Sequence, residues 1–248
     1  MNIKLLQWNI WIKEKIEHIV KEIKRLDPDI ICLQELTREC EYNRFIDTPD
    51  YIANRLGFDY FFYEAQSWEK GPTKSQGNGI FSRWPIEKSS YTYIQQPPSS
   101  SFVKNSSAEG RVYIQAEIQT NSELLTVGTT HLSFTKFFTD VDLKKRQIDV
   151  LINSIKKNSR YFVFAGDLNS PPESYVVPQL TKMLNHAGPS FEQKTWATKI
   201  HDKDGFRVDS LQYRLDYVFA TKDLQVKSAK IVQTDYSDHL PVLVEFDV

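Results

Sequence analysis

Polar side chains that can bind metals or move protons stand beside apolar stretches throughout this sequence. Asn9 follows the apolar stretch at residues 3–8, and Glu35 follows the one at residues 30–34. The same placement recurs along the chain for His131, Asp167, Asn169, Asp216, Asp238 and His239. Buried carboxylates, amides and imidazoles cost desolvation free energy unless they find partners. A divalent cation and a phosphate group would supply such partners, so we expect these residues to converge on one site.

The residue types in this set favour a hard cation that binds oxygen. Mg²⁺ takes oxygen ligands and keeps several waters, so a few carboxylates and amides suffice to hold it. Cys32 and Cys40 are the two cysteines of the chain, and their spacing fits neither a zinc site nor a disulfide framework. The sequence also lacks a Gly-x-Ser-x-Gly nucleophile pattern and a glycine-rich phosphate loop with a lysine. Zinc chemistry, serine hydrolysis and nucleotide-cradling loops are therefore disfavoured.

The elements that must position these residues follow from hydrophobic periodicity. Helices are expected at residues 14–26, 48–56, 140–157 and 173–184, with Thr48 as the cap of the second. The third is expected to turn Leu143, Ile148, Leu151, Ile152 and Ile155 inward. Strands are expected at residues 3–8, 30–34, 61–63, 80–82, 111–119, 124–130, 161–165, 215–220, 226–232 and 241–248. This mixture of βα units and antiparallel hairpins predicts an α/β fold: a four-layer sandwich of two packed mixed β-sheets flanked by helices.

Residues 1–248 are expected to form one domain, and three long loops are expected within it. These loops cover residues 65–78, 95–110 and 187–212, and long ordered loops are often functional. Phe134, Phe137 and Phe138 follow His131 closely. If they are exposed, they would form an apolar rim suited to a lipid or a stacked base, and otherwise they are buried under the next helix.

A series of short motifs resembles the ordered motifs of the exonuclease–endonuclease–phosphatase superfamily, from the first expected strand to the last. They are Gln7-Trp8-Asn9, Leu33-Gln34-Glu35, Gly77-Asn78-Gly79-Ile80-Phe81-Ser82-Arg83, Thr129-Thr130-His131-Leu132, Gly166-Asp167-Leu168-Asn169, Arg214-Leu215-Asp216-Tyr217 and Ser237-Asp238-His239-Leu240-Pro241. Any one of these is weak, but their common order is specific. The resemblance implies a hydrolase that uses Mg²⁺ or Mn²⁺ to cleave a phosphodiester or phosphomonoester.

The same resemblance implies roles for the metal ligands. Glu35 resembles the principal ligand, with Asn9 and Asp238 completing or flanking the metal site. Arg111, which opens an expected strand, and Asn78, between two glycines, are candidates for contacts with the substrate phosphate.

Further roles carry over to the catalytic residues. Asp167 resembles the residue that orients or deprotonates the attacking water, and Asn169 the one that hydrogen-bonds the phosphate. His239 resembles the histidine on the scissile phosphate, with Asp216 as its carboxylate partner, and His131 would donate to a phosphoryl oxygen. Whether Asp167 or His239 is the general base stays open, as does the number of metal ions.

The net charge of the chain limits the classes of substrate that we expect it to bind. The chain has 31 Lys and Arg against 32 Asp and Glu, a net charge of −1, which is unlike proteins that grip long nucleic acids through many phosphates. We therefore expect a small molecule, a lipid head group or a short nucleic acid as substrate. A DNA or RNA nuclease is the alternative, and an inactive binding module on the same fold is a weaker one. No signal peptide or transmembrane segment is visible, so a location in the cytoplasm is expected, and a monomer is the default expectation.

Overall fold

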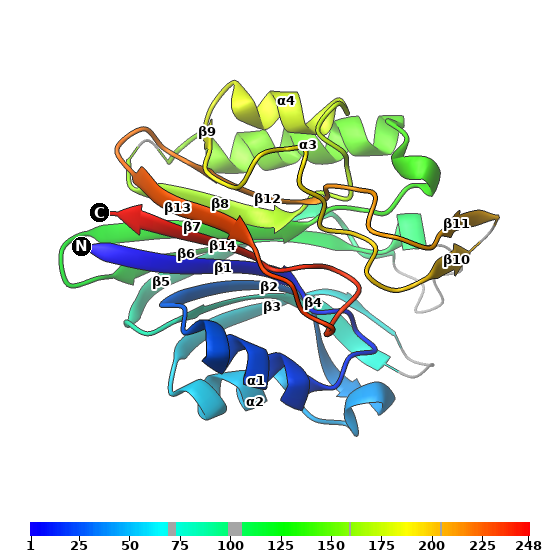
Figure 1. Cartoon of the computed structure of the whole chain (residues 1–248), viewed down its shortest axis with the longest axis horizontal. Coiled ribbons are helices and arrows are strands. Elements are labelled where there is room, and N and C mark those ends of the chain that lie inside the picture. Colours follow the sequence, from blue (N-terminus) through cyan, green and yellow to red (C-terminus); the bar gives the residue numbers. More distant parts are fainter. Residues whose placement is uncertain (69–72, 99–105, 159, 204) are drawn as a thin grey trace.

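The structure, a computed structural model, describes residues 1–68, 73–98, 106–158, 160–203 and 205–248. Within these ranges, two six-stranded sheets pack face to face, and helices cover the outer face of each (Figure 1). The fold predicted from the sequence, an α/β sandwich with two mixed sheets, is therefore confirmed. Among the described residues, no helix is long and apolar enough to cross a membrane.

The first sheet has the order β13-β14-β1-β2-β4-β3. Its central strands β1 and β2 are parallel, and its other neighbouring strands are antiparallel. Their bounds are β1 (Asn2–Asn9), β2 (Ile30–Cys40), β3 (Asp59–Ser67), β4 (Thr73–Ser82), β13 (Gln225–Ile231) and β14 (Val242–Asp247). The first and last strands of the chain thus lie side by side, and this brings residues near the two ends of the sequence together.

The second sheet has the order β5-β6-β7-β8-β12-β9. Here β7 and β8 are parallel, and the other neighbours are antiparallel. The bounds are β5 (Ile86–Gln95), β6 (Arg111–Gln119), β7 (Leu124–His131), β8 (Phe162–Asp167), β9 (Asn185–His186) and β12 (Asp216–Ala220). A separate hairpin, β10 (His201–Lys203) with β11 (Phe206–Val208), extends beyond the sheets at one end of the molecule (Figure 1).

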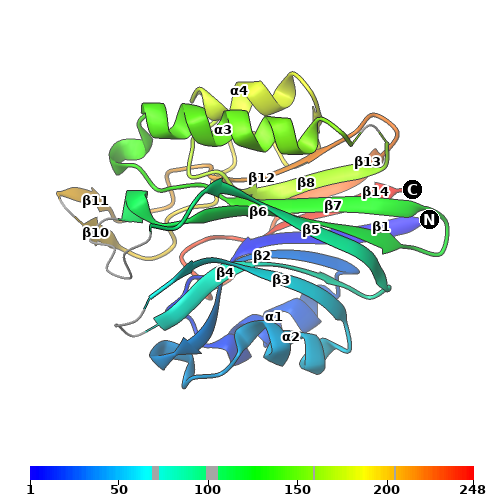
Figure 2. The same ribbon diagram turned by 180° about the vertical axis from the view of Figure 1, so that it is seen from behind.

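Four helices described by the structure lie outside the sheets. They are α1 (Ile16–Leu26) and α2 (Thr48–Leu56) on the first sheet, with α3 (Asp142–Ile155) and α4 (Val176–Thr181) on the second (Figure 2). One apolar cluster fills the space between the sheets, and two others lie under the helix pairs. Because apolar clusters fill the space between these layers, the polar residues lie at the strand ends on one side of the molecule.

Several expected elements needed correction. Residues 65–78 are not one long loop, because 65–67 belong to β3 and 73–78 to β4. The glycines there serve close strand packing: a Cβ on Gly77 would lie 2.1 Å from the carbonyl oxygen of Tyr63 on β3. Strand β2 also continues past residue 34 to Cys40. A bulge between Leu33 and Leu36 accommodates an extra residue, and the pairing of β2 with β4 resumes beyond it.

The other two expected loops contain some regular secondary structure. Strand β5 occupies residues 86–95, and a short 3-10 turn occupies Ser106–Ala108, while residues 99–105 of the expected loop lie outside the described residues. The hairpin β10–β11 lies within the expected loop at residues 187–212. Strand β5 escaped prediction because it is an edge strand exposed on most of its length, so its sequence has no buried face to mark it.

Helix details differ as well. The side chain that caps α2 belongs to Asp47, whose carboxylate accepts the N–H of Asp50, so Thr48 is already the first helical residue. Helix α4 is shorter than residues 173–184, because turns occupy the residues on both sides of it. The buried face of α3 contains Lys144, Gln147, Ile148, Leu151 and Ile155, whereas Leu143 and Ile152 are only half-buried.

Candidate active site

Three polar residues lie in register on adjacent strands of the second sheet. His131 at the end of β7 is paired with Asp167 at the end of β8, and Asp167 is paired with Asp216 at the start of β12. Because β8 is parallel to β7 and antiparallel to β12, the end of β7, the end of β8 and the start of β12 meet at one edge. Oδ2 of Asp167 is 3.4 Å from Nε2 of His131. Asp167 and Asp216 are fully buried, so their charges depend on partners for stability.

The first sheet contributes Asn9 from the end of β1 and Glu35 from the bulge of β2. Glu35 has a positive φ of 62°, in the left-handed region that bulged residues adopt. This geometry turns the carboxylate toward Asn9 and the N–H of Ile12, which donates to its Oε2 at 2.8 Å. The bulge therefore aims Glu35 at the site in the middle of a strand instead of at its end.

The amide of Asn9 bridges two carboxylates. Its Nδ2 donates to Oε1 of Glu35 at 3.2 Å and to Oδ2 of Asp167 at 3.0 Å, while its Oδ1 accepts the N–H of Trp11. The bond from Trp11 fixes which amide atom is oxygen, because a backbone N–H can only donate. Asn9 thus joins the two sheets at the site, and its role as a metal ligand stays a prediction.

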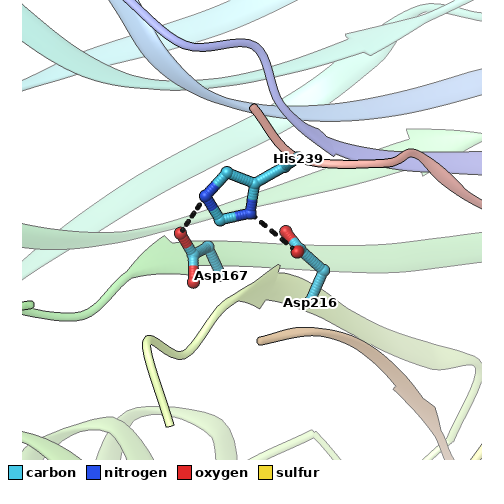
Figure 3. Close-up of side chains that lie close together, drawn as sticks. All are labelled: Asp167, Asp216 and His239. Atoms are coloured by element: carbon cyan, nitrogen blue, oxygen red, sulfur yellow. Dashed lines mark hydrogen bonds and ion pairs between the residues drawn. The ribbon is translucent and has the colours of Figure 1, made fainter. Parts of the chain in front are cut away.

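His239 lies between two carboxylates (Figure 3). Its Nδ1 is 2.9 Å from Oδ2 of Asp216, and its Nε2 is 3.7 Å from Oδ2 of Asp167. Burial lowers the pKa of His239, but the charges of Asp216 and Asp167 raise it more, so the pKa of His239 is about 10. The three residues offer ligand atoms within 4.8 Å of one another. Since both ring nitrogens already face carboxylates, a charge-paired imidazolium explains this trio better than a metal site does.

The loop that carries Asp238 and His239 is fastened to β1. The hydroxyl of Ser237 donates to the carbonyl oxygen of Asn9 at 2.7 Å and accepts the N–H of His239. The indole N–H of Trp8 donates to the carbonyl oxygen of His239 at 2.9 Å. These contacts explain how a turn just before the last strand reaches the same site as the first strand.

Asp238 has a carboxylate oxygen that receives no hydrogen bond from the described part of the chain. Its Oδ2 accepts the indole N–H of Trp196 at 3.2 Å, and its buried Oδ1 has no hydrogen-bond partner among the described residues. Burial raises the pKa of Asp238, and burial together with the charge of Asp238 raises the pKa of Glu35. Two carboxylates that disfavour each other's charge, one with a free oxygen, fit a divalent cation between them.

Asn169 sits against His131 just after β8. Its Nδ2 donates to the carbonyl oxygen of Leu132 at 2.9 Å and lies 2.9 Å from Nε2 of His131. The carbonyl identifies this amide atom as the nitrogen, so Nε2 of His131 is the acceptor. Burial lowers the pKa of His131 to about 3, although the charge of Asp167 opposes the shift. Both observations favour a neutral His131 with its proton on Nδ1.

Arg111 and Asn78 occupy different positions relative to the site. Arg111 opens β6, is buried, and donates to the hydroxyl of Ser133 and to the carboxylate of Glu109. Asn78 donates to the carbonyl oxygen of Val112 at 2.9 Å and lies in a small cavity beside the site. Arg111 lines the main pocket, whereas the amide of Asn78 is hydrogen-bonded to the backbone, and a phosphate contact by either residue stays a prediction.

Most of these side chains line one pocket of about 310 Å³. Eight of the ten residues predicted from the sequence line it: Asn9, Glu35, Arg111, His131, Asp167, Asn169, Asp238 and His239. Asp216 lies behind His239, and Asn78 lies outside the pocket. A volume of this size is at the small end of the range for ligand pockets, which is about 300–1,000 Å³.

The sequence reasoning named Phe134 as part of a possible apolar rim but missed Trp196, which shares the aromatic wall of this pocket with it. Trp196 and Phe134 line it together with His201, and Phe206 of β11 packs behind them. Phe138 is buried in this cluster and contacts Phe134, whereas Phe137 is exposed and packs with its edge against Phe206. His201 lines the pocket, and its Nε2 has no partner among the described residues. Residues 187–212 contain Phe191, Trp196 and Phe206, which is no enrichment in aromatic residues over the rest of the chain, so composition did not mark this wall.

Comparison with known proteins finds relatives of similar sequence and fold. The chain is 24% identical over 254 residues to the UPF0294 protein VP2298 of Vibrio parahaemolyticus, which covers 98% of this chain and 77% of that protein. It shares its fold with D. rerio TDP2 complexed with single strand DNA product, at 19% identity and a TM-score of 0.71 over 100% of this chain and 99% of that one.

A mannosyl-6-phosphatase from Bacteroides thetaiotaomicron has the same fold, at 12% identity and a TM-score of 0.71, covering 99% of this chain and 100% of the other. The sequence model of the Endonuclease/Exonuclease/phosphatase family matches residues 6–239, a span that begins just before Asn9 and ends at His239. The matched span thus contains every residue described above for the pocket. The chain belongs to the endonuclease/exonuclease/phosphatase family.

Proposed function

We propose that this protein is a phosphoesterase that depends on Mg²⁺ or Mn²⁺ and cleaves a phosphodiester or phosphomonoester with water. The observation that carries the proposal is the pairing of Glu35 and Asp238 in the pocket, with Oδ1 of Asp238 lacking a partner among the described residues. The same pocket is lined by Arg111 and His239, whose cationic side chains suit an anion, whereas both amide hydrogens of Asn169 are already directed at Leu132 and His131. A carboxylate pair facing a set of donors suits a cation and a phosphate bound together.

Glu35 and Asp238 would hold the cation, with Asn9 as a further predicted ligand. Such a cation would supply Lewis acidity and neutralise charge on the phosphate. The remaining work belongs to side chains of the chain itself, because phosphoryl transfer depends mainly on positioning and on stabilising negative charge.

Asp167 and His239 divide the proton chemistry. His239 faces a carboxylate at each ring nitrogen, which favours its doubly protonated form, so it suits donation to a phosphoryl or leaving-group oxygen. Asp167 lines the pocket, and Asn9 holds one of its oxygens, so it is placed to orient water and accept its proton. We therefore favour Asp167 over His239 as the general base.

The pocket also favours a compact substrate. Glu109 lines the rim and already pairs with Arg111, so a second anionic group of a substrate would meet a carboxylate there. The aromatic wall suits an apolar or planar organic group beside the phosphate. We also propose that residues 1–248 form one domain, because both sheets contribute to the pocket. A cytoplasmic monomer remains a prediction from the sequence.

The test is an assay of purified protein with Mg²⁺ or Mn²⁺ on bis-p-nitrophenyl phosphate and p-nitrophenyl phosphate, repeated in EDTA. Release of nitrophenol that EDTA abolishes is expected, and Asp167→Asn protein serves as the control for a contaminating enzyme. Release that is undiminished in EDTA, or equal in the Asp167→Asn protein, would refute the proposal.

A nuclease acting on a short single strand is the second candidate. The wall of Phe134, Trp196 and His201 could stack a base, and Lys203 at the rim could meet a neighbouring phosphate. Binding measured with inactive His239→Ala protein separates these cases. A compact substrate should give a slope of log K against log salt of about −1 to −2, whereas a slope of about −5 or steeper on duplex DNA would mean that many phosphates are neutralised.

A further inference from the structure

Lys144 is a buried charge that the proposed chemistry does not use. It lies on the inner face of α3 and is fully buried, although lysines rarely lose all contact with water unless they are paired. Its Nζ donates to the carbonyl oxygens of Leu168 and Asn169, at 2.8 Å and 2.9 Å. Lys144 does not line the pocket, so any effect on the site must pass through these two residues.

The turn that Lys144 holds has an unfavourable backbone conformation. Asn169 has a φ of 45°, in the left-handed region that non-glycine residues seldom adopt. Its N–H donates to Oδ1 of Asp167 at 2.8 Å, which closes the turn over Leu168. In this conformation the carbonyl groups of Leu168 and Asn169 both point at one ammonium group. Strained conformations persist only where the surrounding structure fixes them.

Two pocket residues depend on this turn. Asp167 precedes it and meets Asn9, while Asn169 ends it and places its amide against His131. A small rotation of the turn would therefore move the carboxylate and the amide together. Burial lowers the pKa of Lys144 to about 7, and the charge of Asp167 opposes this shift, so the two groups interact through space as well.

We propose that Lys144 is a positioning residue, whose ammonium group fixes the turn from Asp167 to Asn169 in the conformation that the reaction needs. The kinetic part of this proposal rests on the phosphoesterase function. The structural part does not, since it concerns the order of the turn in the protein without substrate.

The test compares Lys144→Met with Lys145→Met. Lys145 is the next residue of α3, is exposed and, among the described residues, approaches only Asp142 within ion-pair distance, so its variant controls for losing a lysine from the helix. Hydrogen exchange of the Asn169 amide, followed by NMR, reports on the turn without any substrate. Exchange on the order of tenfold faster in Lys144→Met than in Lys145→Met is expected.

Turnover of bis-p-nitrophenyl phosphate is the second measurement. In Lys144→Met, kcat should fall about 10- to 100-fold, as when other orienting partners are removed, with KM within about twofold of wild type. Lys144→Arg, which keeps the charge and the donors, should recover part of kcat. A merely structural lysine would lower the melting temperature without this split between kcat and KM or this rescue.

Wild-type exchange at Asn169 together with wild-type kcat in Lys144→Met would overturn the proposal. If that variant does not fold, Lys144→Gln makes the same comparison with a neutral side chain that retains a donor. If wild type itself hydrolyses no ester, the phosphoesterase function fails, while the exchange measurement still decides whether Lys144 holds the turn.

Discussion

The amide of Asn9 donates to Oδ2 of Asp167 at 3.0 Å, and this bond joins the end of β1 in one sheet to the end of β8 in the other. The same nitrogen also donates to Glu35. Asn9 therefore separates two carboxylates that would otherwise face each other across the site without a donor between them.

Replacing Asn9 by Asp should remove this donor and place a third carboxylate against the other two. We expect kcat to fall by about 10²-fold or more, because the position of Asp167 and the charge balance change together. Asn54→Asp is the matched control, since Asn54 donates to the carboxylate of Asp50 on the exposed surface of α2. Similar rates for both variants would show that the bridge has no part in turnover.

A divalent cation should stabilise the fold through Glu35 and Asp238. Adding Mn²⁺ or Mg²⁺ should raise the melting temperature, because ligands that bind the native state stabilise it by mass action. Glu35→Gln should remove most of this increase. In EDTA the same variant should melt at a higher temperature than wild type, since it no longer repels Asp238. The exposed Glu39 on β2 provides the control Glu39→Gln, and equal metal responses in both variants would contradict the assignment.

Removing His239 or Asp167 should abolish most of the activity while the protein remains folded. Positioned acid–base groups contribute about 10²–10⁴-fold, so His239→Ala and Asp167→Ala should lose kcat within that range. Asp216→Asn should cost less, because it weakens the partner of His239 without deleting the imidazole. His18→Ala, on the partly exposed side of α1, should keep wild-type kcat. The ranking fails if Asp216→Asn is the most damaged variant.

His186 should make stability depend on pH in the acid range. Burial lowers the pKa of His186 to about 4, helped by the charge of Arg214. Below pH 6.5 the unfolded chain binds a proton that the folded protein rejects until about pH 4, so stability falls as the pH falls through this window. His186→Gln should reduce that loss, which thermal melts at pH 7 and pH 5 would measure. An unchanged pH dependence would contradict the shift.

The sequence was informative about the site because polar residues stand directly beside the apolar stretches that form buried strands. Asp167 and Asp216 could be assigned to one edge from their places beside buried strands, and the register of β8 with β12 confirms that they are neighbours. Glu35 was correctly singled out, but not the bulge that aims it, because a bulge leaves no periodic signal when the strand continues beyond it.

The contacts of Lys144 and Trp196 could not be predicted from hydrophobic periodicity. A lysine on an amphipathic helix predicts an exposed face, and only the two carbonyl groups of the turn after Asp167 explain why Lys144 is buried. Trp196 lies in a stretch with little regular structure, and its partner Asp238 is 42 residues away in the sequence. Such partners arise from the packing of distant segments and are invisible to local periodicity.

The bond from Asn9 to Asp167 spans 158 residues, and the bond from Trp8 to His239 spans 231. Contacts between residues this far apart in the sequence form late, because the chain loses entropy in closing a large loop before the contact can stabilise it. The pocket therefore cannot form from either half of the chain alone. Strand β1 must pair with β14 before His239 reaches Asp167. During refolding, catalytic competence should be among the last properties to return, after most helices and strands have already formed.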